Sequence, residues 1–333
     1  EIHKKINSYQ KKLLNMKISV ALCTYNGFKY ISQQIDSILN QQGIVPDEII
    51  ICDDKSSDET LKILHNYKIL HPNIFKIYSN EINLGSTKNF EKAISLCSGD
   101  YIFLSDQDDI WKNNKIQQIL SVFKEHPYAE GVFSNADLID EVNKPIKSIT
   151  IWESIFFLEK ELPKPIDFFN IISKNGNMVT GATLCIKSTI KSFIFPFTDD
   201  ILHDEKIATQ LALRKSLFYT TENLISYRLH DKQQVGMKNI NKIVKKNRIR
   251  RIILDLETPI TFNEYRQLFK KKYLKLIKAE KLQHHLFPTR EIEDLILKCH
   301  QEFCEINLQM KSKFPLRYSI VKQIDKLLGK RKV

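Results

Sequence analysis

The sequence predicts an α/β fold in which a largely parallel sheet is flanked by helices and followed by a basic helical region. Two observations support this prediction: strands and helices alternate over the first 125 residues, and the composition shifts to helix formers and basic residues after Gly236. With 333 residues, 42% of them hydrophobic and only 9 glycines, the chain can bury a sizeable core and lacks a low-complexity composition.

The alternation begins with short apolar runs separated by segments of helical periodicity. Ser56 and Glu59 have the spacing of a capping box and are expected to open the helix after the second strand. Strands that alternate with helices predict a parallel sheet, whose ligands gather at the carboxyl ends of the strands. The expected strands are Ile18–Cys23, Glu48–Cys52, Phe75–Tyr78 and Tyr101–Ser105.

Beyond residue 130 the pattern is looser, with further expected strands at 131–136, 183–186, 217–220 and 224–228 and an expected helix at 205–213. After residue 236, apolar stripes at helical spacing predict helices that pack on one another. We expect three parts, of which the second has two halves. They are an extension at 1–16, a domain at 17–236 with halves at 17–130 and 131–236, and a helical region at 237–333.

The positive charge belongs to the last part of the chain. Residues 237–333 contain 24 Lys and Arg against 10 Asp and Glu, a net of +14, whereas residues 1–236 carry a net of −2. A basic surface indicates an anionic partner, and the run Lys245–Arg251 suits an anionic membrane or nucleic acid, although a solvated helix face explains it equally well. We expect peripheral contact with a membrane and no nucleic acid.

No apolar run is long enough to cross a bilayer, and residues 1–15 lack the apolar centre of a signal peptide. The six cysteines form no CxxC pair and most lie in apolar runs, which indicates reduced, buried thiols. These features predict a cytoplasmic protein, peripheral on the inner face of the membrane if the basic region binds lipid.

Acidic residues cluster directly after the predicted strands, above all Asp106, Asp108 and Asp109. Three carboxylates within four positions repel one another unless a cation or solvent screens them. Hard oxygen ligands at this density suit Mg²⁺ or Mn²⁺, which commonly bridge a carboxylate to the phosphates of a substrate. The sequence therefore predicts a divalent metal site after the fourth strand.

Four segments together resemble family 2 glycosyltransferases of the GT-A fold, and most closely the rhamnosyltransferase-like branch. They are Ile18–Gly27, Ile49–Asp58, Asn83–Gly85 and Ser105–Trp111, and the resemblance extends over about residues 17–236. It implies a Rossmann-like mixed sheet, a nucleoside-diphosphate sugar as donor, and a glycan or lipid-linked acceptor in bacterial surface polysaccharide synthesis.

The resemblance also implies roles for individual residues. Asp106 and Asp108 match the DxD element that holds the metal, and His230 matches a histidine that completes the metal shell. The residues implied at the donor nucleotide and its diphosphate are Cys23, Thr24, Tyr25, Asn26, Asp53, Asp54, Lys88, Asp106 and Arg228.

On the acceptor side, His203 and Asp204 match the family's Glu-Asp motif, with His in the place of Glu. The resemblance implies that Asp204 is the general base of a single displacement that inverts the anomeric centre. The adjacent Glu205 is the alternative base. A carboxylate within hydrogen-bond reach of the acceptor hydroxyl suffices for this role.

The sequence disfavours two other classes of nucleotide-binding enzyme and leaves two alternative functions open. Sugar nucleotidyltransferases and dinucleotide oxidoreductases are disfavoured because Thr24–Gly27 holds a single glycine and no GxGxxG. A sugar-nucleotide-binding module of a larger polymerising enzyme, or a basic membrane- or nucleic-acid-binding protein, are the alternatives. The resemblance favours a deoxyhexose donor such as rhamnose, while galactose, glucose and N-acetylhexosamines stay open.

Overall fold

The computed structural model describes residues 16–146, 149–231, 247–285 and 290–327, so the expected extension at 1–16 lies outside the described residues except for Met16. The chain divides into two compact units. The sheet unit comprises residues 1–159 and 177–238, and the helical unit comprises residues 160–176 and 239–333. Residues 160–176, expected in the acceptor half of the domain, thus belong with the C-terminal helices.

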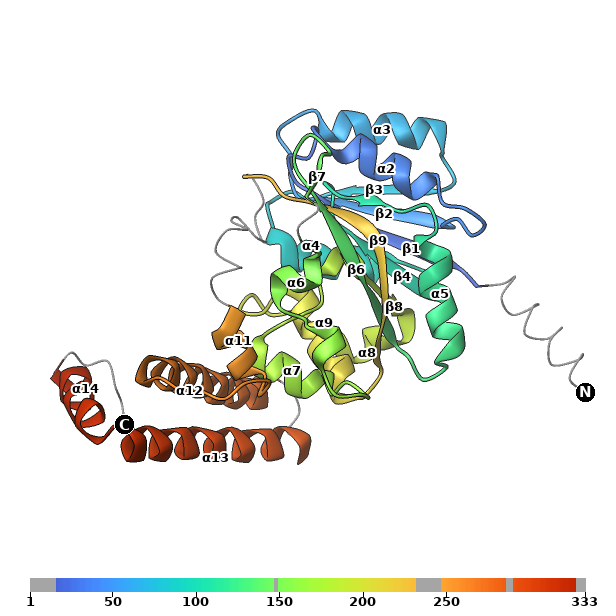
Figure 1. The fold of residues 1–333 in the computed structure, drawn as a ribbon. Helices are drawn as coiled ribbons and strands as arrows, with labels where there is room; N and C mark the ends of the chain where they lie inside the picture. The colour runs from blue at the N-terminus through green and yellow to red at the C-terminus, as the bar shows by residue number, and fades with distance from the viewer. Residues whose placement is uncertain (1–15, 147–148, 232–246, 286–289, 328–333) are drawn as a thin grey trace, which may run out of the picture. The chain divides into compact units, whose positions relative to one another are not determined.

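One mixed, nine-stranded sheet organises the described part of the sheet unit, in the order β3-β2-β1-β4-β8-β6-β9-β5, with β7 beside β6 (Figure 1). The first four strands are parallel, and β8 reverses direction between β4 and β6. The strands are β1 (Ile18–Thr24), β2 (Glu48–Asp53), β3 (Phe75–Ser79), β4 (Tyr101–Ser105), β5 (Ile110–Trp111), β6 (Gly131–Ile139), β7 (Pro145–Ile146), β8 (Leu184–Lys187) and β9 (Leu217–Arg228).

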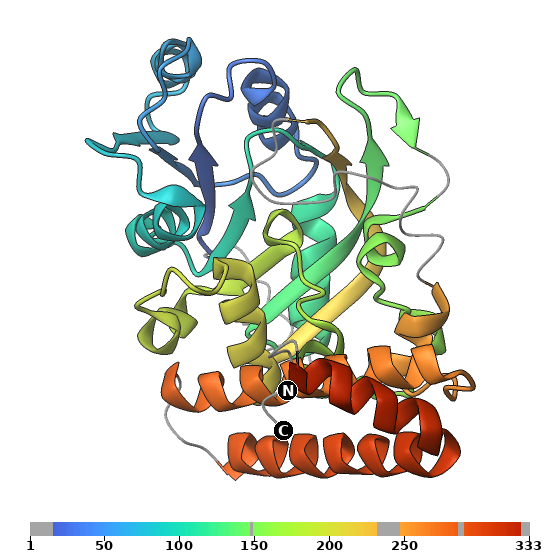
Figure 2. The same cartoon turned by 90° about the vertical axis from the view of Figure 1, so that its left-hand side faces the viewer.

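The central strands are buried along their whole length, as their continuous apolar runs predict for a parallel sheet covered on both faces. Helix α4 packs on β1 and β2, and α5 packs on β6 and β9 (Figure 2). The helices of this unit are α2 (Ile31–Leu39), α3 (Thr60–Leu70), α4 (Gly85–Leu96), α5 (Lys115–Glu125), α6 (Ile151–Ile155), α8 (Lys191–Ile194) and α9 (His203–Leu213). Its 3₁₀ turns are Gly181–Thr183 and Ser188–Ile190, and a third turn, Glu159–Glu161, has only its first residue in this unit.

Two expectations about local structure are wrong. Helix α3 begins at Thr60, whose N–H is accepted by Asp58, while the Ser56 hydroxyl donates to Asp53, so the expected capping box does not form. The two strands expected at 217–220 and 224–228 are one strand, β9, because an irregularity in its pairing with β6 absorbs the polar residues between them.

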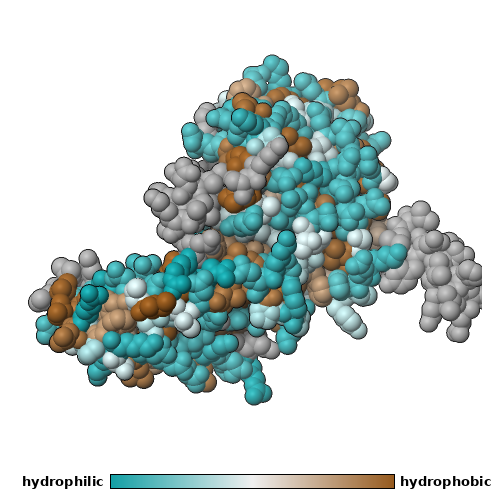
Figure 3. All heavy atoms as spheres, viewed as in Figure 1, coloured by the Kyte–Doolittle hydropathy of each residue, from teal (hydrophilic) through white to brown (hydrophobic). Residues whose placement is uncertain are grey.

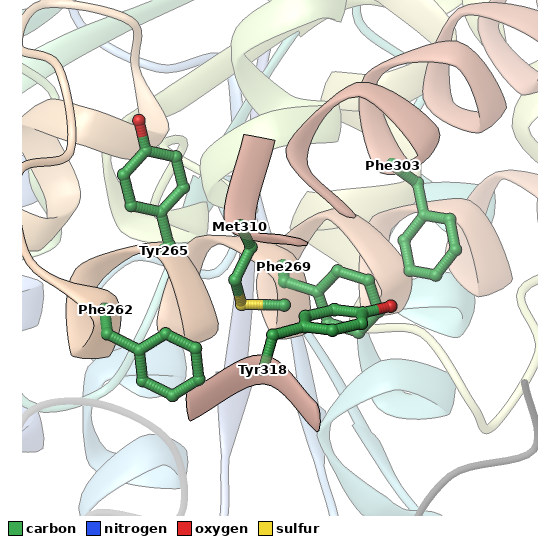
Figure 4. Packing of buried hydrophobic residues seen from close by; sticks show 6 residues of the cluster. All are labelled: Phe262, Tyr265, Phe269, Phe303, Met310 and Tyr318. Carbon is green, nitrogen blue, oxygen red and sulfur yellow. The ribbon is translucent and has the colours of Figure 1, made fainter. Parts of the chain in front are cut away.

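The helical unit is built from α7 (Phe168–Asn175), α11 (Asn247–Ile253), α12 (Phe262–His285), α13 (Arg290–Lys313) and α14 (Pro315–Leu327). Its largest cluster gathers aromatic rings of α12, α13 and α14 around a methionine, and the Phe269 and Phe303 ring centroids are 4.5 Å apart. Figure 4 shows the members Phe262, Tyr265, Phe269, Phe303, Met310 and Tyr318. The apolar stripes predicted for this region therefore form packed core.

Two further sequence expectations concern membrane crossing and thiols. None of the helices in the described ranges combines the length and the apolar content needed to span a bilayer. All six cysteines are free thiols, and five of them are buried as expected, while Cys304 is exposed.

Candidate active site

A cavity of about 970 Å³ opens in the sheet unit where β1, β2 and β4 end. Because parallel strands bring their carboxyl ends to one edge, the polar segments that follow them meet there. Most of the residues expected in the site line this cavity: Cys23, Thr24, Tyr25, Asn26, Asp54, Asp106, Asp108, His203, Asp204 and His230.

The loop after β1 is held in one conformation by side chains of the loops after β2 and β4. The Gln107 carboxamide accepts from Tyr25 N at 2.8 Å and donates to Tyr25 O at 2.9 Å. A side chain at Gly27 would collide with Gln107, since a Cβ there would lie 2.1 Å from its Oε1. No motif in the sequence indicated this role for Gln107, and its place between Asp106 and Asp108 is the one signal that could have pointed to it.

Asp53 and Asp54 have different roles. The Asp53 carboxylate is fully buried, accepts hydrogen bonds from Thr24 and Ser56, and does not line the cavity. The structure therefore does not bring Asp53 to the expected nucleotide site, because its oxygens tie the loops after β1 and β2 together. Asp54 does line the cavity, and its Oδ2 accepts from Gly85 N at 2.9 Å.

The three aspartates after β4 also divide. Asp106 and Asp108 line the cavity, whereas Asp109 points into the protein and its Oδ1 accepts from Arg228 N at 3.0 Å. Burial, together with the charges of Asp108 and Asp204, raises the pKa of the Asp106 carboxyl to about 7. Asp108 Oδ2 lies 2.8 Å from His230 Nε2.

Lys115 lies beneath this acidic loop and is fully buried. Its Nζ donates to Ala182 O at 2.7 Å and lies 3.9 Å from the centroid of the Trp111 ring. Burial lowers the pKa of Lys115 to about 7, against the opposing effect of Asp109. The sequence analysis missed this residue, since a lysine at a helix N-terminus carries no signal of burial.

The donors present fit a divalent cation that the substrate helps to hold. Within the described residues, no group of three or more His, Cys, Asp or Glu side chains converges on one point as a complete protein site would. Mg²⁺ and Mn²⁺ are often held by one or two carboxylates plus waters and substrate phosphates, so Asp106, Asp108 and His230 need not form a closed shell. Burial first, and then the charges of Asp108 and Asp204, raise the pKa of Asp106, and a cation at this place would offset the repulsion between the carboxylates.

The other wall of the cavity carries His203 and Asp204, both in the first turn of α9, which starts two residues before the expected helix. Asp204 Oδ2 accepts from Gly181 N at 3.1 Å, while Oδ1 has no hydrogen-bond partner among the described residues. A Cβ at Gly181 would lie 2.7 Å from His203 Nε2, so only glycine permits this close approach. Burial raises the pKa of Asp204 to about 7, which keeps this carboxylate basic.

Burial favours the neutral form of His203. It stacks on Phe90 with centroids 4.0 Å apart, and neither ring nitrogen has a partner within the described part of the chain. Burial lowers the pKa of His203 to about 3. Glu205, the alternative base, follows Asp204 on α9 but is absent from the lining of the cavity.

Two basic residues expected at the diphosphate do not line the cavity. The Arg228 guanidinium is buried and donates to Asp108 O, Asn143 and Gln33, so it joins the loop after β4 to the loop after β6 and to helix α2. Lys88 Nζ donates to Glu91 at 2.8 Å and to the carbonyl of Phe197. The expectation that either contacts the nucleotide is thus not supported by the geometry, because both side chains are engaged in protein contacts.

Comparison with known proteins agrees with this arrangement. The sequence model described as glycosyl transferase family 2 matches residues 19–181, which include β1 through the Gly181 turn. An uncharacterized glycosyltransferase of Haemophilus influenzae is 28% identical over 229 residues, 67% of this chain and 68% of that protein. The dTDP-rhamnosyl transferase RfbG of Shigella flexneri is 37% identical over 120 residues, 35% of this chain and 38% of that protein.

Among solved structures, the crystal structure of S. aureus TarS superposes with a TM-score of 0.50 at 14% identity, covering 90% of this chain and 55% of that one. This likeness concerns the fold alone. The sequence alignment with the Shigella flexneri RfbG protein covers only 38% of that protein. The mixed sheet, the strand-end motifs and the family match agree: residues 19–181 match glycosyltransferase family 2, and the sheet unit has the GT-A fold.

Proposed function

We propose that this protein transfers a sugar from a nucleoside diphosphate to a hydroxyl group of a glycan or lipid-linked acceptor, with inversion, during the synthesis of a bacterial surface polysaccharide. The observation that carries the proposal is the shared cavity, which brings Asp204 together with Asp106 and Asp108 from separate elements of the fold. A carboxylate base facing an acidic, cation-compatible wall is the arrangement that such a displacement requires.

The nucleotide would bind along the loop after β1. Tyr25 lines the cavity with its ring partly exposed, so it offers an aromatic face to a base. Asp54 Oδ2 accepts one hydrogen bond, from Gly85 N, and a carboxylate oxygen can accept more than one. An N–H of the nucleobase is therefore a suitable further donor to Asp54, with Cys23, Thr24 and Asn26 forming the rest of this wall.

A Mg²⁺ or Mn²⁺ ion held by Asp106 and Asp108, with His230 beside them, would stabilise the charge that grows on the departing diphosphate. Gln107 would support this metal site, because its carboxamide bonds both the N–H and the carbonyl of Tyr25 and so joins the loop after β4 to the loop after β1. Lys115 would also support the site, because its Nζ joins α5 to the carbonyl of Ala182. Ala182 follows Gly181, whose N–H donates to Asp204.

Asp204 would accept the proton of the acceptor hydroxyl as its oxygen bonds to the anomeric carbon. The bond between that carbon and the phosphate oxygen breaks in the same displacement, and the nucleoside diphosphate leaves with the electron pair. Since no covalent intermediate intervenes, the anomeric configuration inverts. Glu205 is a poor alternative as base because it does not line the cavity.

The donor sugar is a deoxyhexose such as rhamnose in this proposal. Its support is the similarity of the first part of the chain to a protein named a dTDP-rhamnosyl transferase. For the location, we propose peripheral attachment to the cytoplasmic face of the membrane through residues 237–333, whose net charge of +14 suits anionic lipid.

The test is a panel of nucleotide sugars, with dTDP-rhamnose, UDP-galactose, UDP-glucose and UDP-N-acetylglucosamine supplied with Mn²⁺. We expect release of the nucleoside diphosphate from one or two donors, with dTDP-rhamnose foremost, and loss of release when EDTA removes the cation. If no donor were turned over or bound, or if EDTA had no effect, the proposed chemistry would be refuted.

A further inference from the structure

Helix α14 presents an apolar face that nothing in the described part of the helical unit covers. Leu316, Ile320 and Ile324 follow one another at intervals of four residues and are 80%, 56% and 47% exposed. Residues four apart lie on the same side of a helix, so these three side chains form one outward stripe. Figure 3 shows hydrophobic surface at the position of α14 in Figure 1.

This stripe is distinct from the face with which α14 packs. Tyr318 is buried in the aromatic cluster (Figure 4). Val321 packs against this cluster, and Asp325 accepts from the Arg266 guanidinium at 3.0 Å. These residues lie roughly opposite Leu316 and Ile320 on a helix with 3.6 residues per turn. The packing of the helical unit therefore explains one apolar face of α14 and leaves the other unexplained.

The charge around the stripe is positive. Arg317 is exposed and follows the edge of the stripe beside Ile324, and the acidic residue of this helix, Asp325, is buried and ion-paired. In the sequence, Lys330, Arg331 and Lys332 follow two residues after the end of α14. An apolar helix face bordered by Lys and Arg is the combination that binds at the interface of an anionic bilayer.

We propose that the outward face of α14, the stripe of Leu316, Ile320 and Ile324 with Arg317 at its edge, docks on an anionic lipid surface. The inference deepens and rests on the proposed function, in which the acceptor is presented at a membrane. A second copy of this chain fits the face less well, because a symmetric contact through the stripe would bring Arg317 of one copy near Arg317 of the other. Nucleic acid would use the cations and leave the stripe in water.

The test is flotation of the full chain with vesicles of phosphatidylcholine, with and without phosphatidylglycerol. We expect the wild-type chain to float with the anionic vesicles, and the L316S/I320S variant to bind at least about tenfold more weakly, because two large side chains no longer enter the interface. The matched control is I69S/L70S, which removes two similarly exposed apolar side chains from α3 in the sheet unit and should float as the wild type does.

A second variant, R317Q, removes the cation at the edge of the stripe and keeps the stripe. We expect it to lose binding to anionic vesicles most strongly at low salt, where the electrostatic attraction is least screened. Equal flotation of the wild type and L316S/I320S would overturn the proposal. So would a wild-type dimer that fails to float and that L316S/I320S converts to monomers, which would assign the face to a second copy.

Release of nucleoside diphosphate in solution, without vesicles, separates this inference from the proposed function. If L316S/I320S turns over donor normally but does not float, both proposals stand. If the wild type floats but turns over no donor, the membrane surface stands and the proposed reaction fails.

Discussion

The cavity of the sheet unit and the aromatic cluster of the helical unit differ in the kind of side chain that they bury. Around the cavity, Asp106, Asp204 and Lys115 each have a pKa moved to about 7, because burial disfavours their charged forms. In the helical cluster the buried groups are aromatic rings and a methionine, and the nearby cation Lys313 donates to the Tyr265 hydroxyl at 2.7 Å. The cavity buries ionisable groups with shifted pKa values, which is typical of active sites, whereas the cluster buries apolar groups, which stabilise the fold.

If this contrast is correct, substitutions in the cavity should change activity with little loss of stability, and substitutions in the cluster should do the reverse. Four predictions examine it, from the largest expected effect to the smallest.

The Asp204→Asn variant should lose transfer by about 10²- to 10⁴-fold, the range for removal of a general base. Its free energy of unfolding should change little, because the amide can still accept from Gly181 N. Turnover and urea denaturation measure the two quantities. The matched control is Glu205→Gln on the same helical turn, which should stay near wild-type activity. Loss of activity in Glu205→Gln alone would move the base to Glu205.

The Phe303→Ala variant should lower the stability of the helical unit by about 3–5 kcal/mol, since it removes a ring packed against Phe269 and leaves a cavity. Thermal or denaturant unfolding followed by circular dichroism measures this loss. Binding of nucleoside diphosphate by the sheet unit should be unchanged at a temperature where the variant is folded. A strong loss of nucleotide affinity in the folded variant would contradict the separation of the two regions.

Acid should destabilise the sheet unit through His203. Its pKa is about 3 in the folded state and about 6.5 when unfolded, so below pH 6.5 the unfolded chain binds a proton that the folded one does not. This contribution to stability is fully present above pH 6.5 and is lost as the pH falls toward 3, by about 2 kcal/mol at pH 5. Urea denaturation at pH 7 and pH 5 measures the loss, and it should be smaller in His203→Phe. An equal loss in that variant would assign the acid sensitivity to other groups.

The Asp108→Ala variant should weaken the Mn²⁺-dependent affinity for a nucleoside diphosphate by about tenfold or more, equivalent to about 1.4 kcal/mol. The reason is that it removes a carboxylate from the proposed metal site. Calorimetric titration with and without Mn²⁺ measures the effect. Glu59→Gln, on an exposed residue paired with Lys62, is the control and should bind normally. Unchanged affinity in Asp108→Ala would remove Asp108 from the proposed metal site.

Local patterns predicted the first four strands and most of the residues that line the cavity. The buried β-branched runs predicted β1, β2 and β4, and the polar residues after them, from Cys23 to Asn26 and from Asp106 to Asp108, line the cavity as expected. This success has a physical reason. In a parallel sheet the end of each strand is set by its own sequence, and the topology brings those ends to one edge.

The tertiary structure decided which neighbours of these residues face the cavity and which support it. Asp53 and Arg228 belong to the same motifs as Asp54 and His230, yet their side chains turn toward other loops and are used there. Likewise, Lys115 and Gln107 contribute only because distant segments, Ala182 and Tyr25, lie within hydrogen-bond reach. A linear pattern specifies which residues lie at the end of a strand, whereas the direction and partner of each side chain depend on contacts between segments far apart in the sequence.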